Sequence, residues 1–236
     1  VTTKGQNSIL AGEGNNIVSA AYSTVIGGTS NSIQYDQNYS GSSIGNTILS
    51  SNGSTIFGQQ HSTIIGGHEN TIQFGVNDIQ GKNGILGGKE NIIKWEDSSV
   101  VLGGTGNTIN GIVNKPYENA GNSIVGGFNN YITSASTSVI VGGNNNTISS
   151  DDVIKNSVIL GGDNIQANKD NTVFVPYLSI GNAESGTPAA SLAIQADGKV
   201  ITGHTVPVGT SINVVANTDP NVFGYSVVNY TATSPG

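Results

Sequence analysis

Apolar residues recur along this chain in pairs, and each pair is followed by a turn signal. The pattern is plainest at residues 62–72, Ser-Thr-Ile-Ile-Gly-Gly-His-Glu-Asn-Thr-Ile, where an apolar pair leads through two glycines to an asparagine and a single isoleucine. Nine copies of this phrase occur before residue 165. Long stretches with the 3.6-residue spacing of an amphipathic helix are missing, so the repeat predicts short strands joined by tight turns.

The spacing between successive copies alternates between short and long. Counted from the first apolar residue of each copy, the separations are 16, 23, 16, 21, 16, 23, 16 and 19 residues. The larger unit is therefore a pair of coils, with a short link inside the pair and a longer loop between pairs. The first apolar residues are Ile9, Val25, Ile48, Ile64, Ile85, Val101, Ile124, Ile140 and Ile159.

Three further columns of this alignment carry structural meaning. A buried isoleucine is expected eight residues after the first apolar position. The glycines that follow each apolar pair are expected to turn a corner, because glycine adopts positive φ at low cost. An asparagine two residues before that isoleucine can form a ladder, in which each side-chain amide bonds to the coils above and below. The predicted ladder comprises Asn15, Asn31, Asn70, Asn91, Asn107, Asn130 and Asn146, with Ser54 in one coil.

These columns predict an all-β fold, a β-solenoid or β-roll of about nine stacked coils spaced about 4.8 Å apart. We expect a solenoid shaft over residues 1–165, a transition or linker over residues 166–190, and a small C-terminal β region over residues 191–236. Residues 171–180 form a candidate strand exchanged between subunits. Residues 192–201 predict a hairpin with Asp197-Gly198 at its turn, and residues 206–236 a small cap or attachment module.

The second residue of every apolar pair is also aliphatic. Successive strand residues point to opposite faces, so the first member fills the coil and the second faces outwards. Nine such side chains, at roughly 100 Å² each, make a stripe of about 900 Å², beyond the 300–600 Å² of a typical monomer's largest patch. We expect other copies to cover it in a closed homotrimer, with the chain's own loops as the alternative cover. The predicted interface comprises Leu10, Ile26, Leu49, Ile65, Leu86, Leu102, Val125, Val141 and Leu160.

Composition narrows the class of partner. The 236-residue chain has a formal net charge of −7 and no arginine, whereas nucleic-acid binding requires clustered Lys and Arg. No apolar run approaches the ~18–20 residues of a membrane span. We therefore expect neither a nucleic-acid partner nor membrane insertion. The absence of cysteine excludes a disulfide framework and is compatible with an extracellular location.

Candidate chemistry in the repeats is sparse. The three histidines are too scattered to predict a metal site. Glu69 and Glu90 fall at the same place in adjacent coils, within reach of the spacing of paired glycosidase carboxylates. However, Lys89 lies beside Glu90, and exposed like charges are ordinary on a solenoid surface. We expect no enzymatic activity, no catalytic residue, no cofactor and no metal.

Aromatic residues in the loops and links are the better candidates for ligand recognition. Functional residues often lie on loops held by a rigid scaffold, and aromatic faces beside Asn, Asp and Gln suit stacking against sugar rings. Alternatively, each aromatic side chain covers an isoleucine of its own coil. The candidate ligand-binding residues are Tyr35, Tyr39, Phe74, Trp95 and Tyr117.

Some copies of the phrase resemble known repeats. Residues 122–127 (Asn-Ser-Ile-Val-Gly-Gly) and 156–162 (Asn-Ser-Val-Ile-Leu-Gly-Gly) resemble head repeats of YadA-like trimeric autotransporter adhesins and are similar to repeats in trimeric bacteriophage tail and head fibres. The resemblance covers roughly residues 7–165. It implies parallel, trimeric, left-handed β-rolls that hold a binding surface away from a cell or virion. The coils here are longer than the adhesin repeat. Nothing after residue 165 resembles a coiled-coil stalk or a membrane-anchoring barrel, which favours the fibre interpretation.

Three functions follow as expectations. The first is a structural fibre protein of a phage or virus, located on the virion, that contacts other virion proteins and attaches to a cell-surface carbohydrate receptor. The second is a bacterial surface adhesin or extracellular filament subunit on the cell surface, with other surface-filament proteins as partners. The third is a fibre-borne polysaccharide depolymerase that would use Glu69 or Glu90. An ice-binding surface is disfavoured, because Ile92 and Tyr131 interrupt the outward threonines.

Overall fold

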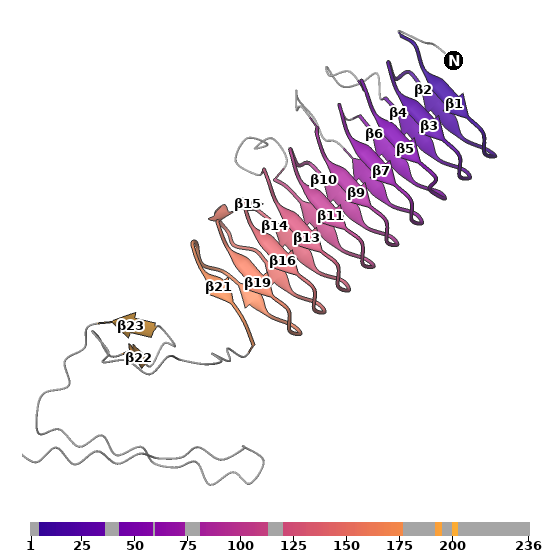
Figure 1. Ribbon diagram of the computed structural model, residues 1–236. Helices are drawn as coiled ribbons and strands as arrows, with labels where there is room; N and C mark the ends of the chain where they lie inside the picture. The colour runs from indigo at the N-terminus through magenta and orange to yellow at the C-terminus, as the bar shows by residue number, and fades with distance from the viewer. Residues whose placement is uncertain are drawn as a thin grey trace, which may run out of the picture. The chain divides into compact units, whose positions relative to one another are not determined.

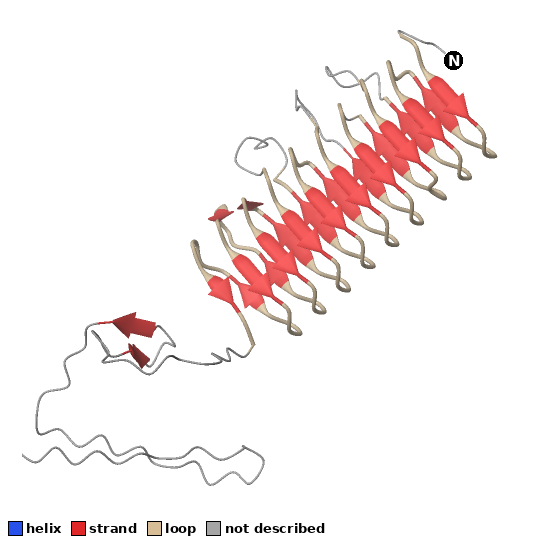
Figure 2. Ribbon diagram, in the orientation of Figure 1, coloured by secondary structure: helices blue, strands red, loops and turns tan. Residues whose placement is uncertain are grey.

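The repeat folds as a parallel β-solenoid in the computed structural model (Figure 1). The structure describes residues 5–35, 43–58, 60–73, 81–112 and 120–176, together with the backbone of residues 192–194 and 200–202. Over these ranges the regular structure is entirely strand, without helix (Figure 2). The predicted all-β solenoid is therefore confirmed. Contacts divide the chain into two compact units, Val1–Ser179 and Ile180–Gly236.

The first strand of each coil joins one parallel sheet, which we call the first sheet. Neighbouring strands in this sheet come from successive coils, so like positions of the repeat lie side by side, as in the pairing of Ile64 with Ile85. Within the described residues its strands are, in order, β1 (Ser8–Leu10), β3 (Thr24–Ile26), β5 (Thr47–Leu49), β7 (Thr63–Ile65), β9 (Gly84–Leu86), β11 (Val100–Leu102), β13 (Ser123–Val125), β16 (Val139–Val141), β19 (Val158–Leu160) and β21 (Val173–Phe174).

The second strand of each coil joins a second parallel sheet in the same way, which we call the second sheet. A short pair, β15 (Ala135–Ser136) with β18 (Ile154–Lys155), lies outside both sheets. The described strands of the second sheet are β2 (Asn16–Val18), β4 (Ser32–Gln34), β6 (Thr55–Phe57), β8 (Thr71–Gln73), β10 (Ile92–Lys94), β12 (Thr108–Asn110), β14 (Tyr131–Thr133), β17 (Thr147–Ile148) and β20 (Gln166–Ala167).

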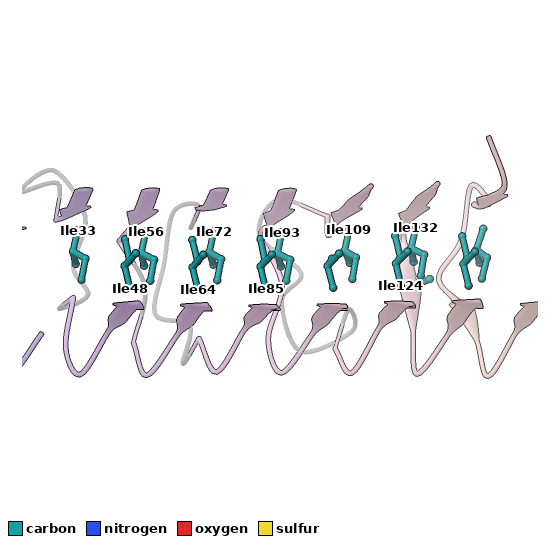
Figure 3. Close-up of a cluster of buried hydrophobic side chains, with 14 of the residues drawn as sticks. Ile33, Ile48, Ile56, Ile64, Ile72, Ile85, Ile93, Ile109, Ile124 and Ile132 are labelled. Atoms are coloured by element: carbon teal, nitrogen blue, oxygen red, sulfur yellow. The ribbon is translucent and has the colours of Figure 1, made fainter. Parts of the chain in front are cut away.

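The core is a double row of aliphatic side chains enclosed between the two sheets. Ile48, from the first sheet, faces Ile56, from the second, and the same meeting recurs along the stack (Figure 3). Almost all of these side chains are completely buried; Ile9, in the terminal strand β1, is half exposed. Both predicted core columns are confirmed, because in-register stacking repeats the same contact in every coil.

Two kinds of corner join the sheets. The glycine corner leads from the first sheet to the second, and the link corner returns to the first sheet of the next coil. At the glycine corner Gly104 has a φ of +80°, and a Cβ there would lie 2.5 Å from the carbonyl oxygen of Gly127. The second glycine of the phrase therefore provides both a left-handed conformation and close approach between coils. The first glycine is less constrained, since Ala11 takes its place with a φ of 61°.

Both sheets continue past residue 165, where the shaft was expected to end. Val173 and Phe174 of β21 pair with Val158 and Ile159 of the same chain, within the segment considered for exchange between subunits. In the second unit, β22 (Leu192–Ile194) pairs antiparallel with β23 (Val200–Thr202), as the predicted hairpin requires. The turn of that hairpin and the predicted cap at residues 206–236 lie outside the described residues.

Candidate functional site

The apolar stripe, the second residue of each apolar pair, lies on the outward face of the first sheet. In β7, Ile64 is completely buried and its neighbour Ile65 is 42% exposed. Ile26 and Leu49 are half-buried. The predicted outward orientation is confirmed, and the nature of its cover stays a prediction. The stripe residues exposed by 38–63% are Leu10, Ile65, Leu86, Leu102, Val125, Val141 and Leu160.

The asparagine ladder forms at the glycine corner. Asn107 Oδ1 accepts a hydrogen bond from the backbone N–H of Asn130 in the next coil (3.0 Å), and Asn107 Nδ2 donates to the Gly127 carbonyl of that coil (3.2 Å). The backbone N–H of Asn107 in turn donates to Asn91 Oδ1 of the preceding coil (3.1 Å). Ser54 takes the same place in one coil, where its Oγ accepts from the Asn70 N–H (3.2 Å).

The ladder differs from the expected one in direction. Most inter-coil bonds of the side-chain amides run to the next coil, and they reach mainly backbone groups. Asn31 also bonds in the other direction, since its Nδ2 donates to Asn15 Oδ1 of the preceding coil (3.1 Å). The physical reason is that each corner exposes one backbone N–H and one glycine carbonyl to the coil before it, and a single amide satisfies both.

A second ladder, which the sequence analysis missed, runs along the link corner. Asn83 Oδ1 accepts from the Ser99 N–H (2.9 Å), and Ser99 Oγ accepts from the Asn122 N–H (3.1 Å). Asparagine and serine alternate as far as Ser138, and Ser157 then repeats serine. Asparagine precedes the coils that a short link follows, where Asn7, Asn83 and Asn122 also donate to a carbonyl of that link. An alignment of every second coil would have shown this ladder in the sequence. The ladder comprises Asn7, Ser23, Asn46, Ser62, Asn83, Ser99, Asn122, Ser138 and Ser157.

The candidate ligand-binding aromatics do not converge in the described part of the chain. Tyr35 and Trp95 occupy the same place of the repeat, two residues after a buried isoleucine, and both are half-buried. Their coils are three strand steps apart in the second sheet, or roughly 14 Å. Lys94 places its ammonium 4.2 Å from the centre of the Trp95 ring. Tyr39, Phe74 and Tyr117 lie outside the described residues.

Charged residues gather at two successive glycine corners. Lys89 pairs with Glu90 (3.0 Å), and His68 lies 3.6 Å from Glu69. His68 and Lys89 are bridge partners in adjacent coils, so Glu69 and Glu90 occupy equivalent positions there. The Glu90 hydrogen bond and charge raise the pKa of Lys89. Lys89 and Glu90 thus form a solvated ion pair, and Glu69 lies beside the His68 imidazole.

Glu96 is the unexpected residue of the link corner, since its side chain is completely buried. Its Oε2 accepts hydrogen bonds from Ser99 Oγ (2.9 Å) and from Asn122 Nδ2 of the next coil (3.1 Å). Its Oε1 makes no hydrogen bond within the described part of the chain. Burial raises the pKa of Glu96 to about 8, against the lowering effect of these two donors.

Asp97 shares this corner with Glu96. Burial raises the pKa of Asp97, and the nearby Lys82 charge opposes that shift. The two acidic residues stand in the link between β10 and β11, directly after Trp95. Comparison of the short links would have drawn attention to Glu96, because the corresponding buried residues are Ala20 and Ala135.

No protein-family model and no curated protein matches this sequence. The described residues contain no group of three or more His, Asp or Glu side chains that could hold a metal ion. They also include no helix long and apolar enough to cross a membrane.

Proposed function

We propose that this chain is a structural fibre protein of a phage or virus, in which three copies of the solenoid associate and present binding surfaces to a host-surface glycan. The observation that carries the proposal is the apolar stripe, which follows the first sheet from Leu10 to Leu160. A solenoid of stacked strands is a rigid, elongated element, as a fibre shaft requires.

A second copy of the chain is the cover that suits the stripe best. The stripe has the period of the coil stack, so an identical stripe on a parallel copy repeats in the same steps. Stable interfaces bury about 800 Å² on each partner, which is the scale expected for nine aliphatic side chains in a row. Three such chains around one axis cover all three stripes and close the assembly.

The oligomeric state is tested by sedimentation equilibrium. The expected mass is three times the 24.0 kDa of one chain. Leu102→Asp places a charge in the stripe and should reduce the mass to that of a monomer. Thr108→Asp, in the outward position of β12 on the second sheet, is the matched control and should leave the mass unchanged. A monomeric wild type, or equal effects of the two substitutions, would refute the assembly.

The glycan part of the proposal rests on the aromatic residues of the link corner. An indole or phenol face on a rigid scaffold can stack against a sugar ring, and Lys94 adds a cation beside Trp95. Binding to a glycan array should be lost or reduced at least tenfold in a Tyr35→Ala/Trp95→Ala double variant. Tyr22→Ala, which removes another exposed aromatic of the link corner, should bind as the wild type does. Binding that survives the double variant contradicts this assignment.

A further inference from the structure

The four short links share one backbone template, and this allows their residues to be compared one by one. In the three links described throughout, residues 19–22, 95–98 and 134–137, two residues with φ between 50° and 56° flank a pair of residues without positive φ; in the fourth, the flanking residues have φ of 66° and 51°. The first left-handed residue is Ser19, Gly58, Trp95 or Ser134, and the second is Tyr22, His61, Ser98 or Thr137. Directly after the first, the described links bury Ala20, Glu96 or Ala135.

The link between β10 and β11 departs from this template at two neighbouring positions. Trp95 has a φ of 55° where the other links have serine or glycine, although a bulky residue in the left-handed region is strained. Glu96 places a carboxyl group at the position where Ala20 and Ala135 of the equivalent links place a methyl group. Two neighbouring departures from local rules make this link a place to look for a function.

We propose that the Glu96 carboxyl is a pH-responsive clamp: in its neutral form it holds the link between β10 and β11 to the next coil, and its ionisation releases that link. A backbone bond of the same residue reaches the preceding coil. The Glu96 carbonyl accepts from Asn83 Nδ2 of the preceding coil (2.8 Å), and Glu96 Oε2 accepts from Ser99 of its own coil and Asn122 of the next.

An ionised Glu96 has no compensating partner in this corner. Its Oε1 is bounded by Gly111, where an added Cβ would lie only 3.2 Å from that oxygen. The contacting residues Asn83, Ser99, Gly111 and Asn122 are neutral. Among the described charged groups, Asp97 repels the ionised form, and Lys82 acts on Asp97. A buried charge without an ion pair is costly, so the carboxyl must gain water when it ionises.

The link can yield more readily than the sheets around it. Strands β10 and β11 are each paired on both sides by parallel ladders. The link is held by isolated backbone bonds, such as that from Gly121 N–H to the Asp97 carbonyl (3.0 Å), and it holds two left-handed residues, Trp95 and Ser98. Outward movement of the link would hydrate Glu96 and relieve the strain at Trp95. The inference concerns the fold itself and holds whether or not Trp95 contacts a sugar.

Trp95 is the only tryptophan of the chain, so its fluorescence reports on this link alone. With selective indole excitation of the full-length protein between pH 5.5 and 9.5, the wild-type emission should shift with a midpoint near the Glu96 pKa of about 8. Glu96→Gln should abolish the shift, and Asp97→Asn should retain it. If Glu96→Gln does not fold, Glu96→Ala replaces it, since alanine already occupies this place at Ala20 and Ala135.

A second measurement identifies the titrating group directly. The carboxyl ¹³C signal assigned to Glu96 should titrate with the same midpoint as the Trp95 emission. The proposal is overturned by a wild-type emission that is constant over this range, by a shift that persists in the Glu96 variants, or by a Glu96 signal that titrates below pH 6. A shift lost only in Asp97→Asn would assign the effect to Asp97 and would also overturn it.

Discussion

Replacement of Asn107 by alanine tests whether the asparagine ladder stabilises the solenoid. The substitution removes the only acceptor that the structure gives the backbone N–H of Asn130, a completely buried residue. It also removes one of two donors to the Gly127 carbonyl, which keeps the bond from the Thr105 N–H (3.0 Å). An unsatisfied buried donor costs about 1–3 kcal/mol, and the second lost bond about 0.5–1.5 kcal/mol. We expect a loss of about 2–4 kcal/mol in the free energy of unfolding.

Urea unfolding followed by circular dichroism measures this loss, at one fixed protein concentration because assembly would make stability depend on concentration. Asn107→Ser should lose less than Asn107→Ala, since Ser54 already serves as the acceptor in one coil. Asn145→Gly is the control: Asn145 is exposed at the same corner with a φ of 52°, which glycine adopts freely. If Asn107→Ala is as stable as this control to within about 0.5 kcal/mol, the ladder is not a source of stability.

Three further predictions concern the corners and the core. Gly104→Ala should prevent folding or lower the urea midpoint far more than Gly126→Ala, because a methyl group at 104 meets the Gly127 carbonyl whereas nothing lies within 4 Å at 126. Gly126→Ala should cost about 1–2 kcal/mol. Equal effects of the two substitutions would contradict the close approach at Gly104. Ile109→Ala removes a completely buried side chain and should lower the free energy of unfolding in urea by about 2–5 kcal/mol. The control, Thr108→Ala on the outward face, should cost less than about 1 kcal/mol. A small loss at Ile109 would mean that the core collapses around the cavity. For Glu96, the folded pKa of about 8 lies above its ordinary value of 4.5, so the associated stability is complete below pH 4.5 and falls as pH rises to 8, by on the order of 5 kcal/mol at about 1.4 kcal/mol per pKa unit. Urea midpoints at pH 5, 7 and 9 should show this decline in the wild type and lack it in Glu96→Gln, and an identical decline in both would exclude Glu96 as its source.

The sequence predicts this fold well because in-register stacking makes spatial neighbours out of equal positions in the repeat. Ile93 lies beside Ile72 and Ile109 because all three hold the same place in the phrase. The outward stripe follows equally directly from strand alternation at Ile64 and Ile65. Both features follow from the period of the repeat and from the face of the strand on which each residue lies.

Other features depend on backbone geometry that the phrase does not reveal. The direction of the ladder bonds depends on which backbone groups of each corner face the neighbouring coil, as the bond between Asn107 and Asn130 shows. Glu96 is buried in a link whose flanking residues, Trp95 and Ser98, are left-handed. A tryptophan in the sequence does not predict that conformation. For the apolar stripe, strand alternation determines only that these side chains face outwards, and their cover by other copies is a proposal.

The alternation of Asn and Ser along the link corner makes the pair of coils a unit of length. Removal of residues 85–123 would place Ile124 where Ile85 stood, and Asn83 and Asn122 hold the same position in the second ladder. Removal of the single coil 83–98 would instead set Ser62 against Ser99, as at Ser138 and Ser157 near the end of the ladder, and would put two long loops in adjacent coils. The solenoid can therefore be shortened or extended in steps of two strand spacings, about 9–10 Å, with its apolar stripe and its loops kept on their own sides. The pair of coils is therefore the smallest step by which the length of the solenoid can change without a mismatch at the link corner.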